Sequence, residues 1–237
     1  MKLFFPNLNR EIEIEIQYSY RQTIGIKIAN LTLIIVKSPM KIKESELVNL
    51  LLLKQKWIEK KILHIEQINM SKSVRLFSDG EEFLFLGEKH VLKIDINDGI
   101  KKPSLDIENG LMTISTYSYD TNLIQKIICD WYKKTALEIM IERVNIYQKF
   151  FSISPSFIGI KNQKRRWGSC NSQGKIYFNF KILTAPLYVV DYLVVHEMSH
   201  LVYLNHSSKF WTLVESILPD YQARRNMLKK NEHIYGF

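Results

Sequence analysis

The 237-residue chain has few cysteines and no long apolar segment. Its two cysteines, Cys129 and Cys170, are too few for a disulfide framework, which favours a reducing compartment. The amino-terminal residues lack the sustained apolar region of a secretory signal, and no run approaches the ~20 apolar residues of a membrane span. We therefore expect a soluble, cytoplasmic protein that has no membrane segment.

Glycine and proline are also scarce, at nine and six residues, and neither a low-complexity linker nor an internal repeat is apparent. Hydrophobic residues make up 46% of the chain and charged residues 24%, which indicates a folded protein of one large or two small domains. The net charge of +9 favours anionic partners, so weak contact with nucleic acid is one expectation. The lysines are spread along the chain, which equally favours a merely solvated surface.

Strand patterns dominate the first half. Residues 11–16 alternate Glu with Ile, and short apolar runs between 83 and 115 are separated by turn signals such as Asp98-Gly99 and Asn109-Gly110. One helix is predicted near residues 45–67. We predict an α+β protein, with a β-rich module over residues 1–116 that contains this helix and a second domain over residues 117–237.

The second half is predicted to be mostly helical. Asp120 is a candidate N-cap for a long helix that reaches about residue 151, and further helices are predicted over 186–204 and from Ser207 or Ser208 to Leu218. The strand at 175–181 has two interpretations: an internal strand, or an edge that pairs with an extended peptide.

The helix predicted over 186–204 contains His196-Glu197-Met198-Ser199-His200, an H-E-x-x-H motif. Residues four positions apart lie on one helical face, so His196 and His200 can bind a single tetrahedral ion. Glu197 projects beside them and can accept a proton from a metal-activated water. This pattern predicts a metal-dependent hydrolase.

A third ligand is needed to complete such a site. His206 follows six residues after His200, and we expect Asn205 to adopt the left-handed conformation that returns His206 to the ion. Glu215 on the next helix is the rival ligand. Three protein ligands leave one position open, which is typical of catalytic zinc.

Several blocks around this motif resemble the YgjP-type metallopeptidase-domain family, which is related to SprT-like proteases and other zincins. The resembling blocks are residues 165–170, Asn179, 191–201, 205–211 and 219–221. The resemblance implies a zincin-like core, peptidase activity and a zinc ion bound by His196, His200 and His206, with Glu197 as the catalytic residue. A nucleotide pyrophosphatase activity has also been attached to this type of domain.

Substrate contacts are less clearly marked. Arg165 and Arg166 precede a Gly-Ser turn and could hold a phosphate or a carboxylate, and Asn179 is a further candidate contact. Cys170 is expected to be structural. We predict a zinc metallopeptidase that acts on peptides or proteins. The alternatives are hydrolysis of a nucleoside triphosphate and a non-catalytic nucleic-acid or protein-binding module with structural zinc.

Overall fold

The computed structural model describes residues 1–40, 42–71, 75–163, 166–232 and 234–235, with the backbone alone over 67–71. The chain divides into two units, Met1–Val74 and Arg75–Phe237. Within the described ranges, no helix is both long enough and apolar enough to cross a membrane.

The first unit is a four-stranded sheet followed by two helices. Its elements are β1 (Lys2–Phe5), a 3-10 turn (Pro6–Leu8), β2 (Arg10–Ser19), β3 (Gly25–Ile28), β4 (Leu33–Pro39), α1 (Glu44–Leu53) and α2 (Gln55–Ser71). The strand order is β1-β2-β4-β3, with β2 and β4 parallel. The Glu/Ile alternation buries Ile12 and Ile14 in one core with Leu47 and Leu51 of α1, because successive side chains point to opposite faces of a strand.

The second unit begins with a sheet of the same topology. Its strands are β5 (Glu82–Phe85), β6 (Glu88–Ile96), β7 (Ser104–Glu108) and β8 (Leu111–Thr116). Their order is β5-β6-β8-β7, again with a central parallel pair. The helix α3 (Thr121–Gln148) follows, and it buries Ile124 and Ile128 where α1 buries Leu47 and Leu51. The same four-stranded topology thus occurs twice in the chain, although the sequence shows no apparent internal repeat.

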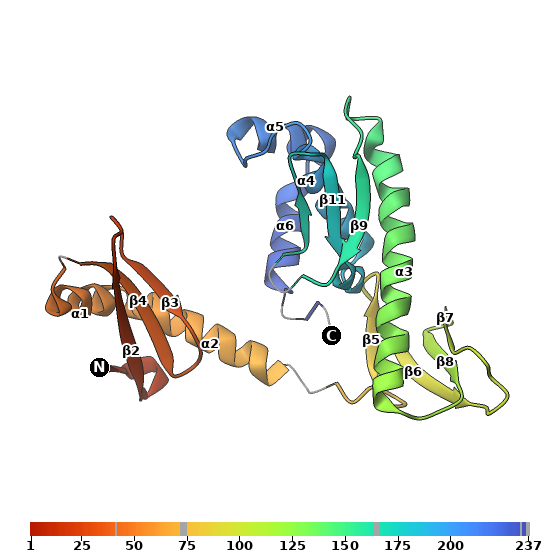
Figure 1. Ribbon diagram of the computed structural model, residues 1–237, viewed down its shortest axis with the longest axis horizontal. Helices are drawn as coiled ribbons and strands as arrows, with labels where there is room; N and C mark the ends of the chain where they lie inside the picture. Colours follow the sequence, from red (N-terminus) through yellow and green to blue (C-terminus); the bar gives the residue numbers. More distant parts are fainter. Residues whose placement is uncertain (41, 72–74, 164–165, 233, 236–237) are drawn as a thin grey trace. The chain divides into compact units, whose positions relative to one another are not determined.

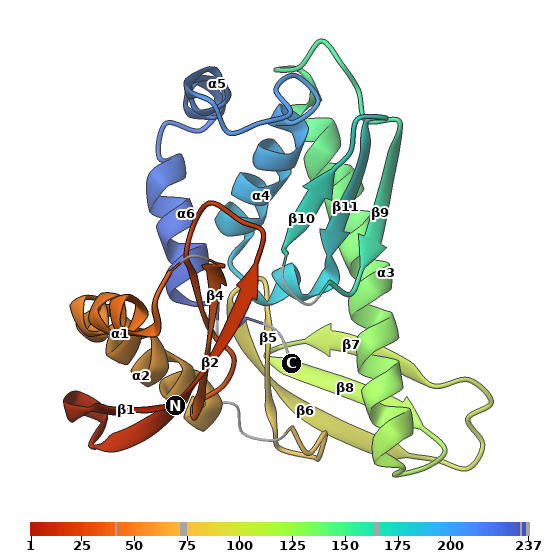
Figure 2. The same cartoon turned by 60° about the vertical axis from the view of Figure 1, so that its left-hand side comes forward.

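Helix α3 connects the two sheets of the second unit, as Figures 1 and 2 show. The Asp120 side chain accepts a hydrogen bond from the Asn122 amide at 2.9 Å, which confirms the predicted cap. The second sheet contains β9 (Phe157–Lys161), β10 (Gly168–Cys170) and β11 (Lys175–Asn179), in the order β10-β11-β9. A 3-10 helix (Phe180–Thr184) and helices α4 (Leu187–Ser199), α5 (Ser208–Ile217) and α6 (Tyr221–Lys230) complete the unit.

Two expectations differ from this arrangement. The division falls after Val74, whereas the sequence placed it after residue 116. The reason is packing between the β5–β8 sheet and α3. Phe83 and Met112 of this sheet share a core with α3, and the hydroxyl of Tyr132 on α3 donates to the Leu84 carbonyl. The edge-strand interpretation of residues 175–181 is wrong, because β11 lies between β10 and β9 and both of its edges are paired.

Candidate metal centre

Helix α4 presents the H-E-x-x-H motif from a buried position. Its apolar side chains fill the core on several sides, and Asp191 joins it to α3 by accepting from Arg143 Nε at 2.6 Å and Nη2 at 3.0 Å. The helix ends at Ser199, with His200 as its C-cap, and is therefore shorter than the predicted 186–204. The motif occupies the last turn of α4, and the loop that follows leads to α5.

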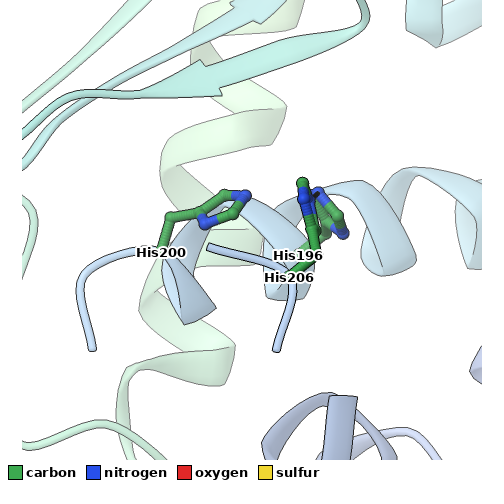
Figure 3. A group of neighbouring side chains, drawn as sticks. All are labelled: His196, His200 and His206. Carbon is green, nitrogen blue, oxygen red and sulfur yellow. Dashed lines mark hydrogen bonds between the residues drawn. The ribbon is translucent and has the colours of Figure 1, made fainter. Parts of the chain in front are cut away.

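The three histidines converge. One imidazole nitrogen from each of His196, His200 and His206 lies within 4.8 Å of those of the other two, and Figure 3 shows the rings gathered at the end of α4. The Nε2 atoms of His196 and His206 are 3.1 Å apart. Zinc–nitrogen bonds of about 2.0–2.1 Å place two tetrahedral ligands roughly 3.3–3.4 Å apart, so the spacing fits one shared ion.

The return of His206 does not depend on a left-handed Asn205, which corrects the expectation from sequence. Among the described residues other than glycine, positive φ angles occur only at Asn9, Phe77, Leu86 and Asn109. The Asn205 side chain instead accepts a hydrogen bond from the Ser207 amide at 3.2 Å. This local bond stabilises the turn between His206 and α5. Glu215 is exposed on α5 and lies outside the histidine cluster.

Two features favour the metal-binding form of the imidazoles. His200 Nδ1 lies 3.0 Å from the Tyr203 carbonyl, which can only accept, so Nδ1 carries the proton and Nε2 keeps a free lone pair. Burial, followed by the charges of the neighbouring histidines, lowers the pKa of His196 to about 3. His196 is therefore neutral at pH 7, and a neutral imidazole is the form that binds metals.

Phe210 of α5 contacts all three histidine rings. Its fully buried ring contacts His196, His200 and His206 at centroid distances of 5.0, 4.6 and 4.9 Å. A rigid apolar platform restricts the rotamers of the three rings without offering a competing ligand.

Glu197 faces β10 rather than solvent and is only 4% exposed. Gly168 lies so close that a Cβ atom there would be 2.5 Å from Glu197 Oε1, so the glycine of the Trp-Gly-Ser-Cys segment leaves room for this carboxylate. Burial raises the pKa of Glu197 to about 8, and the charge of Arg166 opposes the shift. A buried carboxyl with a perturbed pKa beside three convergent histidines is typical of a catalytic site.

Comparison with known proteins agrees with this geometry. Residues 22–231 match the family described as YgjP-like, metallopeptidase domain. The chain belongs to this family. The resemblance predicted from the sequence is thus confirmed over most of the chain, and the α+β fold is confirmed by its helices and mixed sheets.

Other comparisons add little to the YgjP-like assignment. A search of curated proteins finds no match. A solved structure, the metallopeptidase zymogen of Pyrococcus abyssi abylysin, is similar over 38% of this chain and 93% of that chain, with 19% identity and a TM-score of 0.35.

The other residues that the sequence suggested as site residues of the YgjP-like protein differ in burial and in their contacts. Arg166 is exposed, and its charge partly offsets the rise in the pKa of Glu197 that burial causes. Asn179 is 4% exposed, and its amide donates to the carbonyls of Gln163 at 2.8 Å and Arg166 at 3.2 Å, so it supports the loop. Arg165 lies outside the described residues. Burial, followed by the charge of Glu197, raises the pKa of Cys170 to about 11, which agrees with a structural thiol.

The sequence of the YgjP-like protein suggested no role for Trp211, which contacts the histidine cluster, or for Tyr221 and Arg225, which contact Trp211. Trp211 stacks on His206 at 5.6 Å and on Tyr221 at 5.4 Å. The Phe210-Trp211 and Pro219-Asp220-Tyr221 blocks marked the two aromatics, but no local pattern connects Arg225 with the histidines.

The raised pKa of Glu197 predicts a pH-dependent stability difference in metal-free protein. The folded-state pKa of about 8 exceeds the reference value of 4.5. Stability from this group is therefore fully present below pH 4.5 and is lost as the pH rises through 8. Glu197→Gln, which stays neutral, should unfold at a higher temperature than wild type at pH 8, by the equivalent of a few kcal/mol, and near the wild-type temperature at pH 5. Thermal melts in chelator measure this.

Exposed Glu215 provides the matched control, since Glu215→Gln should leave both melts unchanged. Equal unfolding temperatures of Glu197→Gln and wild type at pH 8 would contradict the conclusion that burial raises the pKa of Glu197.

Proposed function

We propose that this YgjP-like protein is a zinc-dependent peptidase, in which His196, His200 and His206 hold the ion and Glu197 is the general base. The observation that carries the proposal is the convergence of three imidazoles next to the buried carboxylate of Glu197, which shares the last turn of α4 with two of them. Membership of a metallopeptidase-domain family supports it. An intact general base also favours an enzyme over a module with purely structural zinc.

A zinc ion held at this site would polarise the scissile carbonyl and lower the pKa of water. The chain supplies the proton chemistry: Glu197 accepts a proton from the attacking water and returns it to the leaving amine. Burial raises the pKa of Glu197 to about 8 and the charge of Arg166 opposes this rise, so the fraction of ionised base, and with it the rate, should increase as the pH rises toward 8. Phe210 and the Tyr203 carbonyl fix the orientation of the histidines, so that little reorganisation accompanies the reaction.

The peptide would enter along β10. Among the described residues, this strand is at the edge of its sheet and pairs with β11 alone, and it contains the glycine that contacts Glu197. An extended peptide can add to a free strand edge through backbone hydrogen bonds. Such binding brings a backbone carbonyl beside Glu197 without requiring a particular side chain.

The proposal is tested by loading the purified protein with zinc and incubating it with an unfolded protein substrate and with a panel of nucleoside triphosphates. We expect about one zinc per chain, proteolysis that stops on chelation, and recovery when zinc is restored. Nucleotide cleavage without proteolysis would replace the peptidase by the triphosphate alternative. Bound zinc with neither activity would favour the binding module.

Arg166 separates the two enzyme classes further. If the substrate is a triphosphate, Arg166→Ala should weaken binding by ~1.5–3 kcal/mol, the scale of hydrogen bonds to charged groups. If it is a peptide, the change should be much smaller, because backbone pairing does not use this charge. Measuring KM for both substrates, with thermal melts to check folding, distinguishes the outcomes.

A further inference from the structure

Near the histidine cluster, α6 contributes an arginine that has no ion-pair partner in the described part of the chain. The Arg225 guanidinium carbon lies 4.7 Å from the centroid of Trp211, the ring that stacks on His206. Among the described residues, the Arg225 side chain forms neither an ion pair nor a hydrogen bond. It is exposed, so its donors are available to a ligand.

The neighbouring Arg224 shows the contrast. Its guanidinium donates from Nε to both carboxylate oxygens of Asp220 at 2.9 Å and from Nη1 to the Tyr188 carbonyl at 3.0 Å. Arg224 thus anchors α6 within the fold. Arg225, one position later, points to a different side of the helix, and within the described ranges its guanidinium contacts the Trp211 ring.

Arg225 reaches the histidine cluster through Trp211. Trp211 provides the physical link, since its ring is 5.8 Å from that of His196 and 5.6 Å from that of His206. The positive charge therefore lies at the rim of the site where the reacting group would be bound.

We infer that Arg225 recognises a carboxylate of the peptide substrate, held beside the His196/His200/His206 cluster. The inference rests on the proposed peptidase function and adds a substrate preference to it. The planar guanidinium presents two parallel donors that match a carboxylate, and stacking on Trp211 restricts its orientation before the substrate arrives. The carboxylate is either the carboxy terminus of the peptide or an acidic side chain near the scissile bond.

The test uses three versions of one short neutral peptide: amidated, with a free carboxy terminus, and amidated with a central Glu. Binding is measured by calorimetry with zinc-loaded Glu197→Gln protein, in which turnover does not interfere. We expect one carboxylate-bearing peptide to bind about 10- to 100-fold more tightly than the neutral one, the scale of a charge-assisted hydrogen bond. Which of the two binds tightly identifies the source of the carboxylate.

Adding Arg225→Gln should remove this preference, and Arg225→Lys should restore only part of it, because an ammonium lacks the two-donor geometry. The matched control is Lys230→Gln, which removes the same charge from an exposed position on α6 and should keep the preference. Equal binding of all three peptides, or a preference that survives Arg225→Gln, would overturn the inference. Hydrolysis of the same peptides by protein with Glu197 intact is scored separately, so its absence counts against the peptidase proposal alone.

Discussion

Glu197→Gln is expected to lower the turnover of a peptide substrate at least ~100-fold while zinc remains bound. The amide keeps the size of the carboxylate but cannot accept a proton from water, and a general base contributes a factor of about 100 to 10,000. Because Glu197 packs against Gly168, the replacement keeps its place and should not disturb the neighbouring histidines. The measurements are kcat/KM for peptide cleavage and zinc content of the same sample.

The same substitution at an exposed glutamate provides the matched control for Glu197→Gln. Glu215→Gln makes the same chemical change on exposed α5, away from the cluster, and should leave turnover at the wild-type level. Near-normal cleavage by the zinc-loaded Glu197→Gln protein would show that another group takes the proton.

His206→Ala is expected to weaken zinc binding by roughly 10- to 1000-fold, since it removes one of three direct ligands, whereas loss of an outer-sphere partner alone is worth about 10- to 100-fold. The 3.1 Å separation between the Nε2 atoms of His206 and His196 is the basis for this expectation. Competition with a chromogenic chelator measures the zinc affinity.

Two further variants define the third ligand. Glu215→Ala should leave zinc affinity unchanged, because Glu215 lies outside the cluster. Asn205→Ala should weaken zinc less than His206→Ala, since it removes only the hydrogen bond to the Ser207 amide. Damage from Glu215→Ala combined with a silent His206→Ala would assign the site to two histidines and one glutamate.

Several features of this protein could be predicted because they depend on residues that are close together in the sequence. The spacing of His196 and His200 determines which helical face they share, whatever surrounds the helix. Asp120 caps α3 through a bond to a residue two positions away, and the Glu/Ile alternation of residues 11–16 sorts buried from exposed side chains. The family resemblance rested on the same local blocks, and the match over residues 22–231 confirms it.

The expectations that differed involved pairing and packing between distant segments. The strand at 175–181 lies inside its sheet because β9 and β10 pair with it from either side. The β-rich half is split after Val74 because the sheet of β5–β8 packs on α3. Asn205 was expected to reverse the chain through its own backbone, whereas α4 ends at Ser199 and the Asn205 side chain supports the turn.

The sequence alone therefore determined the candidate chemistry, namely two histidines and a glutamate on one helix turn with a third histidine close behind. The tertiary structure decided what surrounds these groups: Gly168 against Glu197, Phe210 beneath the three imidazoles, and Arg225 on Trp211 beside His206. Helical spacing is a property of the local backbone. The proximity of β10, α5 and α6 to α4 arises only when the apolar faces of these elements are buried together.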